Sequence, residues 1–130
     1  MAARKLHGRT VVVVGGSRTP FLRSGTGYDD LMAYELGAMA LSGLLQRTRV
    51  DPAVIDRVIL GTVLGEPRTT NLAREAALAA GLPPSCPAFT VTAACASSNA
   101  AMQTGVEAIA CGAAEVVVAG GAETISDVPI

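Results

Sequence analysis

The 130-residue sequence has very few aromatic residues: two Phe, two Tyr and no Trp. Its side chains are small overall, because 23 residues are Ala and 14 are Gly. Such side chains bury little area each, so a stable core needs close backbone approach, many layers or a partner surface. Half of the residues are nevertheless hydrophobic, which excludes a disordered chain. The length suits one ordinary domain.

A strong charge of either sign is also absent, since 10 basic and 11 acidic side chains leave a formal net charge of −1. This balance excludes the basic footprint of a general nucleic-acid binder. No apolar run approaches the ~18 residues that would span a bilayer, so we expect no transmembrane segment. Residues 1–9 form a short basic N-terminal arm, for which a solvated arm is favoured over the remnant of a transit peptide.

Paired cysteines are missing. Cys86, Cys95 and Cys111 are odd in number and lack C-x-x-C spacing, so we expect neither a disulfide framework nor a metal site. Unpaired thiols fit a reducing compartment. The only histidine, His7, lies in the basic arm, where a solvated side chain is the favoured interpretation.

Hydrophobic runs and turn signals alternate along the chain. We expect strands at Thr10–Val14, Asp56–Val63, Ala88–Thr92 and Glu115–Ala119. Helices are predicted from a cap at Asp29 or Asp30 to Arg47, from a cap at Asn71 through Leu72–Ala80, and over Ala96–Cys111, with a short helical turn at Asp51-Pro52. The order β-α-β-α-β-α-β predicts an α/β fold, a mostly parallel sheet with helices on both faces. The thin core, and an end just after a strand, suggest a piece of a longer protein.

Cys95 is the candidate nucleophile. It falls between a predicted strand and a predicted helix, at the carboxyl edge of the sheet where open α/β folds bind ligands. A helix N-terminus favours a thiolate, and its free N–H groups could hold an oxyanion. A buried inert cysteine is an equally good interpretation of this position alone. Cys86 and Cys111 are interpreted as structural or incidental, and no residue offers a general base for Cys95.

Two glycine pairs, Gly15-Gly16 and Gly120-Gly121, each follow a predicted strand. Neither belongs to a G-x-G-x-x-G motif, and no G-K-[ST] is present, so a nucleotide-phosphate loop is excluded. We expect these pairs to let strand ends approach neighbouring backbone.

Five segments, in order and at family spacing, resemble the thiolase family over about Val11 to Ile130. They are Arg18-Thr19-Pro20-Phe21, Val58 to Val63, Asn71-Leu72-Ala73-Arg74, Cys95-Ala96-Ser97 and the segment Ala119 to Ser126. Within the family, the chain is most similar to the β subunits of the fatty-acid-oxidation trifunctional complex and their bacterial counterparts. The resemblance implies a thiolase-like fold, of which residues 10–130 form an incomplete N-terminal domain without the loop domain and C-terminal half.

The resemblance also implies an activity. Thiolases are acetyl-CoA acyltransferases that cleave a 3-ketoacyl-CoA with CoA, giving acetyl-CoA and a shortened acyl-CoA in fatty-acid β-oxidation. Cys95 matches the cysteine that carries the acyl group as a thioester and whose N–H helps to hold an oxyanion. CoA is then a co-substrate and no cofactor is permanently bound. The histidines, the second cysteine and the CoA site belong to later parts of the family's chain, so we expect this 130-residue chain to be inactive alone.

Two alternatives stay open: a ketoacyl synthase of the same fold, and a non-catalytic truncated module. The resemblance implies a homodimer or larger homo-oligomer, with a hydratase/dehydrogenase α subunit as a further partner. A bacterial cytoplasm is the expected compartment, with the mitochondrial matrix as the alternative.

Overall fold

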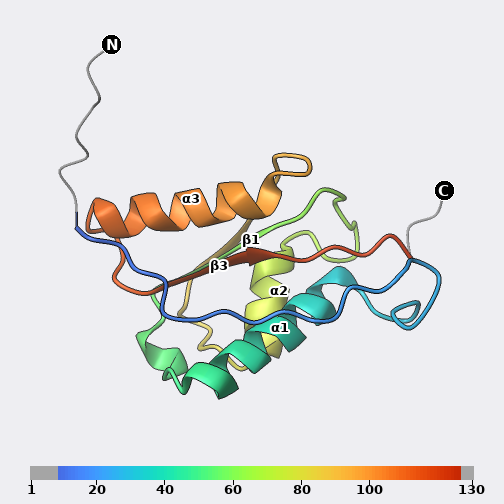
Figure 1. Ribbon diagram of the computed structural model, residues 1–130, viewed down its shortest axis with the longest axis horizontal. Helices are drawn as coiled ribbons and strands as arrows, with labels where there is room; N and C mark the ends of the chain where they lie inside the picture. Colours follow the sequence, from blue (N-terminus) through green and yellow to red (C-terminus); the bar gives the residue numbers. More distant parts are fainter. Residues whose placement is uncertain (1–8, 127–130) are drawn as a thin grey trace, which may run out of the picture.

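Three short parallel strands form the centre of the computed structural model, which describes residues 9–126 (Figure 1). They are β1 (Arg57–Gly61), β2 (Ala88–Val91) and β3 (Val117–Gly121), in the sheet order β2-β1-β3. The central strand is the most deeply buried, since Val58 and Ile59 expose none of their surface. An apolar strand without polar alternation is what burial on both faces requires.

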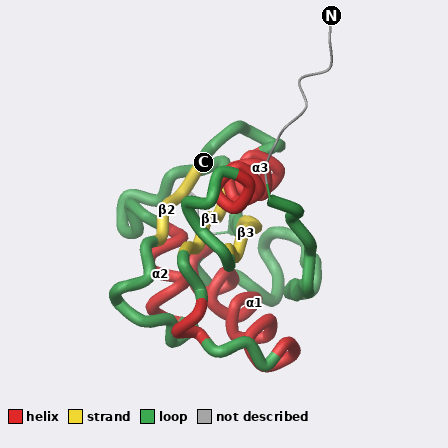
Figure 2. The backbone as a smooth tube through the Cα atoms, turned by 90° about the vertical axis from the view of Figure 1, so that its left-hand side faces the viewer, coloured by secondary structure: helices red, strands yellow, loops and turns green. Residues whose placement is uncertain are grey.

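Helices cover both faces of this sheet, as predicted (Figure 2). Helix α3 (Ser97–Ala110) lies against one face, while α1 (Ala33–Thr48) and α2 (Leu72–Ala79) lie on the other. A 3₁₀ turn, η1 (Pro52–Val54), joins α1 to β1. The core combines Leu, Ile and Val side chains with many alanines. Small residues let α1 and α2 approach closely, since a Cβ added to Gly37 of α1 would stand only 3.2 Å from the Cβ of Ala76 in α2.

Several helices begin or end where capping residues in the sequence predict. The Asn71 side chain accepts a hydrogen bond from the Arg74 N–H and caps α2, and Asp51 accepts one from Ala53 at the start of η1. Gly81 and Gly112 follow α2 and α3 with φ of 87° and 79°, a conformation that favours glycine.

The predicted cap of α1 at Asp29 or Asp30 is wrong. The N-cap is Met32, and the Glu35 carboxylate accepts a hydrogen bond from the Met32 N–H at 2.8 Å. Residues 28–31 form a turn in which the Leu31 N–H bonds to the Tyr28 carbonyl. A glutamate in the first helical turn has taken over the role expected of an aspartate before it.

The predicted strand Thr10–Val14 is also wrong. No strand is assigned before β1 in the described residues, and Val13 is 93% exposed. The β-branched run has the propensity for a strand, but no described strand pairs with it. Instead, the segment that follows it packs on α1, where a Cβ on Gly15 would stand 2.7 Å from the Thr48 methyl group.

The last strand begins two residues later than predicted because Asp56 occupies the preceding amides. Its carboxylate accepts hydrogen bonds from the N–H groups of Glu115 and Val116, at 2.7 and 3.0 Å. These two bonds lower the pKa of Asp56, that of Val116 most strongly. The ladder with β1 therefore starts at Val117, and Gly120-Gly121 lies inside β3 instead of after it.

Candidate active site

Cys95 lies on the turn between the end of β2 and the first residue of α3, and its side chain is exposed. The residue before it, Ala94, has φ of +48°, in the left-handed region that a residue with a Cβ adopts only at an energetic cost. A strand, a sharp turn with one strained residue and a helix together present a side chain at the top of a sheet. The predicted placement of Cys95 at a helix N-terminus is confirmed.

A buried serine, which the sequence did not single out, holds this turn. Ser97 is 4% exposed, and its hydroxyl accepts a hydrogen bond from the Ala93 N–H at 2.9 Å. The same hydroxyl lies 2.6 Å from the Ala94 carbonyl oxygen and 3.2 Å from that of Thr62. Ser97 therefore connects the residues before Cys95 with the end of β1. The polar first turn of α3 was visible in the sequence, but not which of its side chains is buried.

Glu123 holds the loop that follows β1, which Ser97 also contacts. Its carboxylate accepts hydrogen bonds from the Thr62 hydroxyl at 3.2 Å and from the Val63 and Leu64 N–H groups at 2.6 and 3.2 Å. These three donors all belong to the loop that follows β1. Glu123 thus ties the chain after β3 to the chain after β1.

Two glycines let α3 approach the sheet at this point. A Cβ on Gly61 would stand 2.6 Å from the Ser98 nitrogen and closer still to the backbone of Ser97. A Cβ on Gly121 would collide with the Ser98 hydroxyl and lie 2.7 Å from the Gly61 carbonyl oxygen. The expectation that Gly120-Gly121 allows close backbone approach is met at Gly121. At Gly120, the nearest atom would be a Leu60 methyl at an ordinary 3.8 Å.

The other two cysteines differ from Cys95 in position. Cys86 is buried, and this burial raises the pKa of its thiol. The Arg74 guanidinium holds the surrounding loop by donating hydrogen bonds to the Pro84 and Cys86 carbonyls, both at 2.9 Å. Cys111 is exposed and forms the C-cap of α3. The structural interpretation of Cys86 agrees with this burial.

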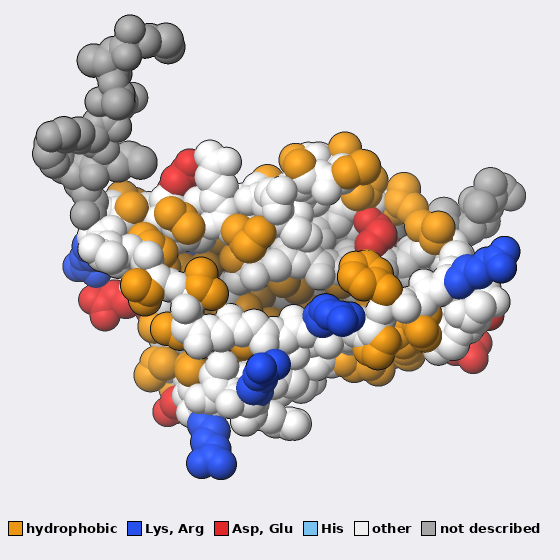
Figure 3. Space-filling view, in the orientation of Figure 1, with side chains coloured by type: hydrophobic (Ala, Val, Ile, Leu, Met, Phe, Trp, Pro, Cys, Tyr) orange, Lys and Arg blue, Asp and Glu red, His pale blue; other side chains and the backbone are white. Residues whose placement is uncertain are grey.

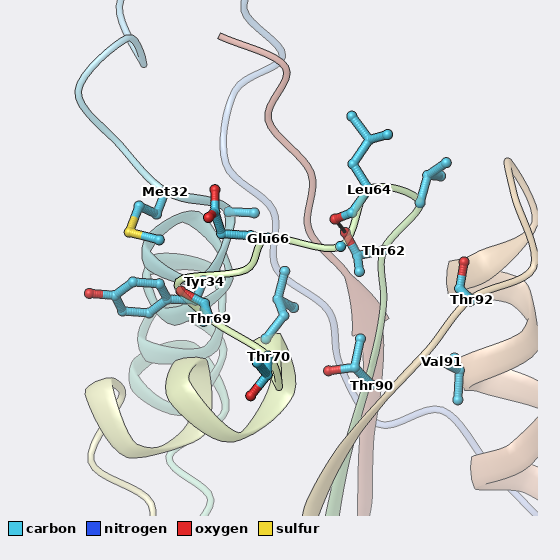
Figure 4. Close-up of a pocket in the computed structure, with 14 residues that line it drawn as sticks. Met32, Tyr34, Thr62, Leu64, Glu66, Thr69, Thr70, Thr90, Val91 and Thr92 are labelled. Carbon is cyan, nitrogen blue, oxygen red and sulfur yellow. Dashed lines mark hydrogen bonds between the residues drawn. The ribbon is translucent and has the colours of Figure 1, made fainter. Parts of the chain in front are cut away.

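A cavity of about 230 Å³ opens at the carboxyl ends of β1 and β2 (Figure 4). Its walls come from the start of α1, the loop after β1 and the end of β2, with Met32, Glu66, Thr70 and Thr92 among them. Its position at this edge of a parallel sheet is typical of ligand sites. Cys95 is not among its lining residues, so the cavity and the candidate nucleophile are separate features of this edge.

Residues 9–126 contain no group of three His, Cys, Asp or Glu side chains that could hold a metal ion. None of the helices described in this range is long and apolar enough to cross a membrane. The single histidine, His7, lies outside the described residues, so these residues supply no imidazole beside Cys95.

The family model of the thiolase N-terminal domain matches residues 11–130. This chain belongs to the thiolase family. It is similar to "Trifunctional enzyme subunit beta, mitochondrial" of Homo sapiens (59% identity over 94% of this chain and 26% of the relative). It is also similar to "3-ketoacyl-CoA thiolase" of Serratia proteamaculans (40% identity over 95% and 28%). The chain thus spans about a quarter of the length of these relatives.

The thiolase-like fold is confirmed by a solved structure. The crystal structure of the Bacillus anthracis acetyl-CoA acetyltransferase matches with a TM-score of 0.90 and 34% identity, over 96% of this chain and 32% of that one. Within this thiolase segment, the motifs that carried the resemblance have separable structural roles. Asn71-Leu72-Ala73-Arg74 fastens α2 to β2 and to the loop around Cys86, since the Asn71 amide also donates to the Ala88 carbonyl. The segment Ala119 to Ser126 contains Glu123, whose carboxylate holds the loop after β1. In the segment Arg18-Thr19-Pro20-Phe21, the Phe21 side chain is 94% exposed.

Proposed function

We propose that a thiolase containing this segment cleaves 3-ketoacyl-CoA with CoA, giving acetyl-CoA and a shortened acyl-CoA. The observation that carries the proposal is the exposed Cys95 on the strained turn at the start of α3. Relatives named 3-ketoacyl-CoA thiolase support it, and membership of the thiolase family favours it over a ketoacyl synthase.

In the first half-reaction, the Cys95 thiolate attacks the 3-keto carbon, and the bond between C2 and C3 of the substrate breaks. The electron pair of that bond leaves as the enolate of acetyl-CoA, which takes up a proton. The shortened acyl group stays on Cys95 as a thioester. In the second half-reaction, the thiolate of a second CoA attacks this thioester, and the acyl-CoA leaves while the Cys95 thiolate is restored. The Cys95 N–H at the helix N-terminus is proposed to stabilise the oxyanion.

Proton transfer needs groups that the described residues do not supply. The family resemblance implies that two histidines and a second cysteine come from other parts of the polypeptide, along with most of the CoA site. We therefore expect no turnover by residues 1–130 alone. CoA acts as a co-substrate in this proposal, and no residue of this chain is assigned to its binding.

The assembly and compartment are proposed from the same relatives. We expect a homodimer or larger homo-oligomer, with residues 10–130 as part of its N-terminal domain behind the basic arm 1–9. Similarity to a protein named as a trifunctional enzyme β subunit supports an α-subunit partner. That relative is named mitochondrial, which favours the matrix alternative over a bacterial cytoplasm.

The test uses a chimeric thiolase, in which residues 11–130 replace the matching segment of the Serratia proteamaculans relative. We expect it to release acetyl-CoA from a 3-ketoacyl-CoA and CoA, and to carry the acyl group on the Cys95 peptide when CoA is withheld. Cys95→Ser should abolish both signals, while the matched control Cys111→Ser, also an exposed cysteine, should keep them. A folded chimera whose Cys95→Ser variant still transfers acyl groups would refute the proposal.

A further inference from the structure

The conformation before Cys95 requires outside support. Ala94 is left-handed, and a non-glycine residue keeps this conformation only where its surroundings hold it. Backbone bonds from Ala96 to the Ala93 carbonyl and from Ser97 to the Ala94 carbonyl, at 3.0 and 3.1 Å, close the turn from one side. The Ser97 hydroxyl closes it from the other side, because it contacts both the Ala93 N–H and the Ala94 carbonyl.

Ser97 also contacts the residue that follows β1. The Ser97 hydroxyl, whose one hydrogen is shared between the Ala94 carbonyl at 2.6 Å and the Thr62 carbonyl at 3.2 Å, lies beside Thr62, and the Thr62 hydroxyl donates to Glu123. The Glu123 carboxylate also accepts the Val63 and Leu64 N–H groups, so the loop after β1 cannot move without breaking these bonds. We call Ser97, Thr62 and Glu123 the turn brace. It runs from the residue after β1 and the segment after β3 to Ala93 and Ala94.

The residues around the turn brace are tightly packed. Gly61 and Gly121 lie so close to the first turn of α3 that a single methyl group on either would collide with it. Thr62 and Ser97 are both buried, so a water molecule cannot easily replace a lost hydroxyl there. Removing a hydroxyl from the brace therefore frees the turn to relax and to change the direction of the Cys95 side chain.

We propose that the turn brace is a positioning device for the Cys95 nucleophile, with Ser97, Thr62 and Glu123 as positioning residues. This inference rests on the proposed function of Cys95. Nucleophilic attack depends on placement to within about 1 Å, and a displacement of that size costs roughly 100-fold in rate. We expect the brace to act on the chemical step, because its side chains bond to backbone groups of the turn and of the loop after β1.

The test compares Ser97→Ala with Ser98→Ala in the chimeric thiolase. Both serines belong to the first turn of α3, but Ser98 is exposed and its hydroxyl makes no hydrogen bond recorded in the described residues. Ser97→Ala should lower kcat by roughly 10- to 100-fold with KM within about threefold, and Ser98→Ala should change neither. The rate of iodoacetamide labelling of Cys95, measured relative to Cys111, should fall by roughly tenfold in Ser97→Ala alone.

A second pair of variants keeps the test decisive if Ser97→Ala does not fold. Glu123 is exposed, so Glu123→Ala removes the acceptors without opening a cavity, while Glu123→Gln keeps one acceptor oxygen. We expect Glu123→Ala to lower kcat and Glu123→Gln to restore most of it. Equal kcat values and equal Cys95 labelling in these two variants and the unsubstituted chimera would overturn the brace. The chimera could transfer no acyl group while Cys95 labelling still falls in the brace variants. That result would refute the proposed function and leave the turn brace standing.

Discussion

Arg74 and Asp56 are two of the charged side chains that bond to backbone groups in this segment, and each gives a local test. The Arg74 guanidinium donates to the Pro84 and Cys86 carbonyls, and the Asp56 carboxylate accepts the two N–H groups that precede β3. Charge-assisted hydrogen bonds to backbone are stronger than neutral ones. Both side chains therefore stabilise connections between elements, and within residues 9–126 neither forms a hydrogen bond to the turn that carries Cys95.

Replacing Arg74 should expose Cys86. Arg74→Ala removes both bonds to the loop around Cys86, which costs about 1–2 kcal/mol in the free energy of unfolding. Because Cys86 is only 5% exposed, its alkylation depends on opening of this loop. We expect Cys86 in the chimeric thiolase to be alkylated several-fold faster in Arg74→Ala, read by peptide mass. Arg47→Ala, an exposed arginine on α1, should leave the rate unchanged, and an unchanged rate in Arg74→Ala would contradict the assignment.

The Asp56 contacts should respond to pH in a defined direction. The pKa of Asp56 is lowered in the folded chain, so its stabilisation is present above the unfolded value of about 3.9 and is lost as the pH falls through the lowered pKa. In the chimeric thiolase, hydrogen–deuterium exchange of the peptide containing Glu115 and Val116 should be faster in Asp56→Asn than in wild type near neutral pH. The difference should vanish once acid protonates Asp56.

The control for this experiment is Asp30→Asn, because Asp30 is exposed and its carboxylate forms no hydrogen bond within residues 9–126. It should leave exchange at Glu115 and Val116 unchanged at every pH. A difference between wild type and Asp56→Asn that persists unchanged into strong acid would exclude the carboxylate as its source.

At the scale of elements, the contact between α3 and the sheet controls where Cys95 lies. Gly61 of β1 and Gly121 of β3 are the points of closest approach, and both face the first turn of α3. Neither residue has a positive φ. Glycine is therefore required at these positions for close packing and not for an unusual backbone angle. The strand ends and the helix start therefore form one packed unit beneath the candidate nucleophile.

Gly61→Ala should damage this unit, whereas Gly120→Ala should not. The added methyl group at Gly61 meets helix backbone, which cannot rotate away, so the free energy of unfolding should fall by about 1–3 kcal/mol or more. At Gly120, the methyl group meets only a Leu60 side chain at 3.8 Å. Thermal unfolding of the two chimeric variants measures the difference. Equal melting temperatures would contradict the packing described here.

The sequence predicted those elements whose ends are set locally. Asn71, Gly81 and Gly112 act through their own side chain or backbone angle, so α2 and the end of α3 could be read directly. The strand expected at Thr10–Val14 failed because pairing needs a neighbour that local propensity does not specify. Cys95 was predicted as the candidate nucleophile from its place between strand and helix. Ser97 was not, because its burial depends on where β1 ends, which is a matter of tertiary packing.

At the scale of the whole molecule, many apolar side chains remain at the surface. Figure 3 shows them spread over one face, and among the described residues Val13, Val14 and Phe21 are at least 80% exposed. Within the described sheet, β2 and β3 each have a single strand neighbour, so each leaves an unpaired edge. Exposed apolar surface and open strand edges both favour association.

We therefore expect the isolated 130-residue chain to self-associate. Size-exclusion chromatography with light scattering should find species larger than the 13.1 kDa monomer, increasing with protein concentration. Within the chimeric thiolase, the segment should show no concentration-dependent association beyond the defined oligomer of the chimera. A monomer that unfolds in one sharp cooperative transition would contradict the expectation.

The central claim, that Cys95 is the nucleophile, is tested most directly by limited alkylation of the chimeric thiolase near neutral pH. The three thiols of this segment differ in position: Cys95 is exposed at a helix N-terminus, Cys111 is exposed at a helix C-terminus, and Cys86 is buried. Because a catalytic nucleophile must be both exposed and reactive, iodoacetamide should modify Cys95 first. Acyl transfer should be lost in proportion to that modification, as read by peptide mass. Modification of Cys86 or Cys111 with Cys95 untouched, or full activity after Cys95 is alkylated, would show that Cys95 is not the nucleophile.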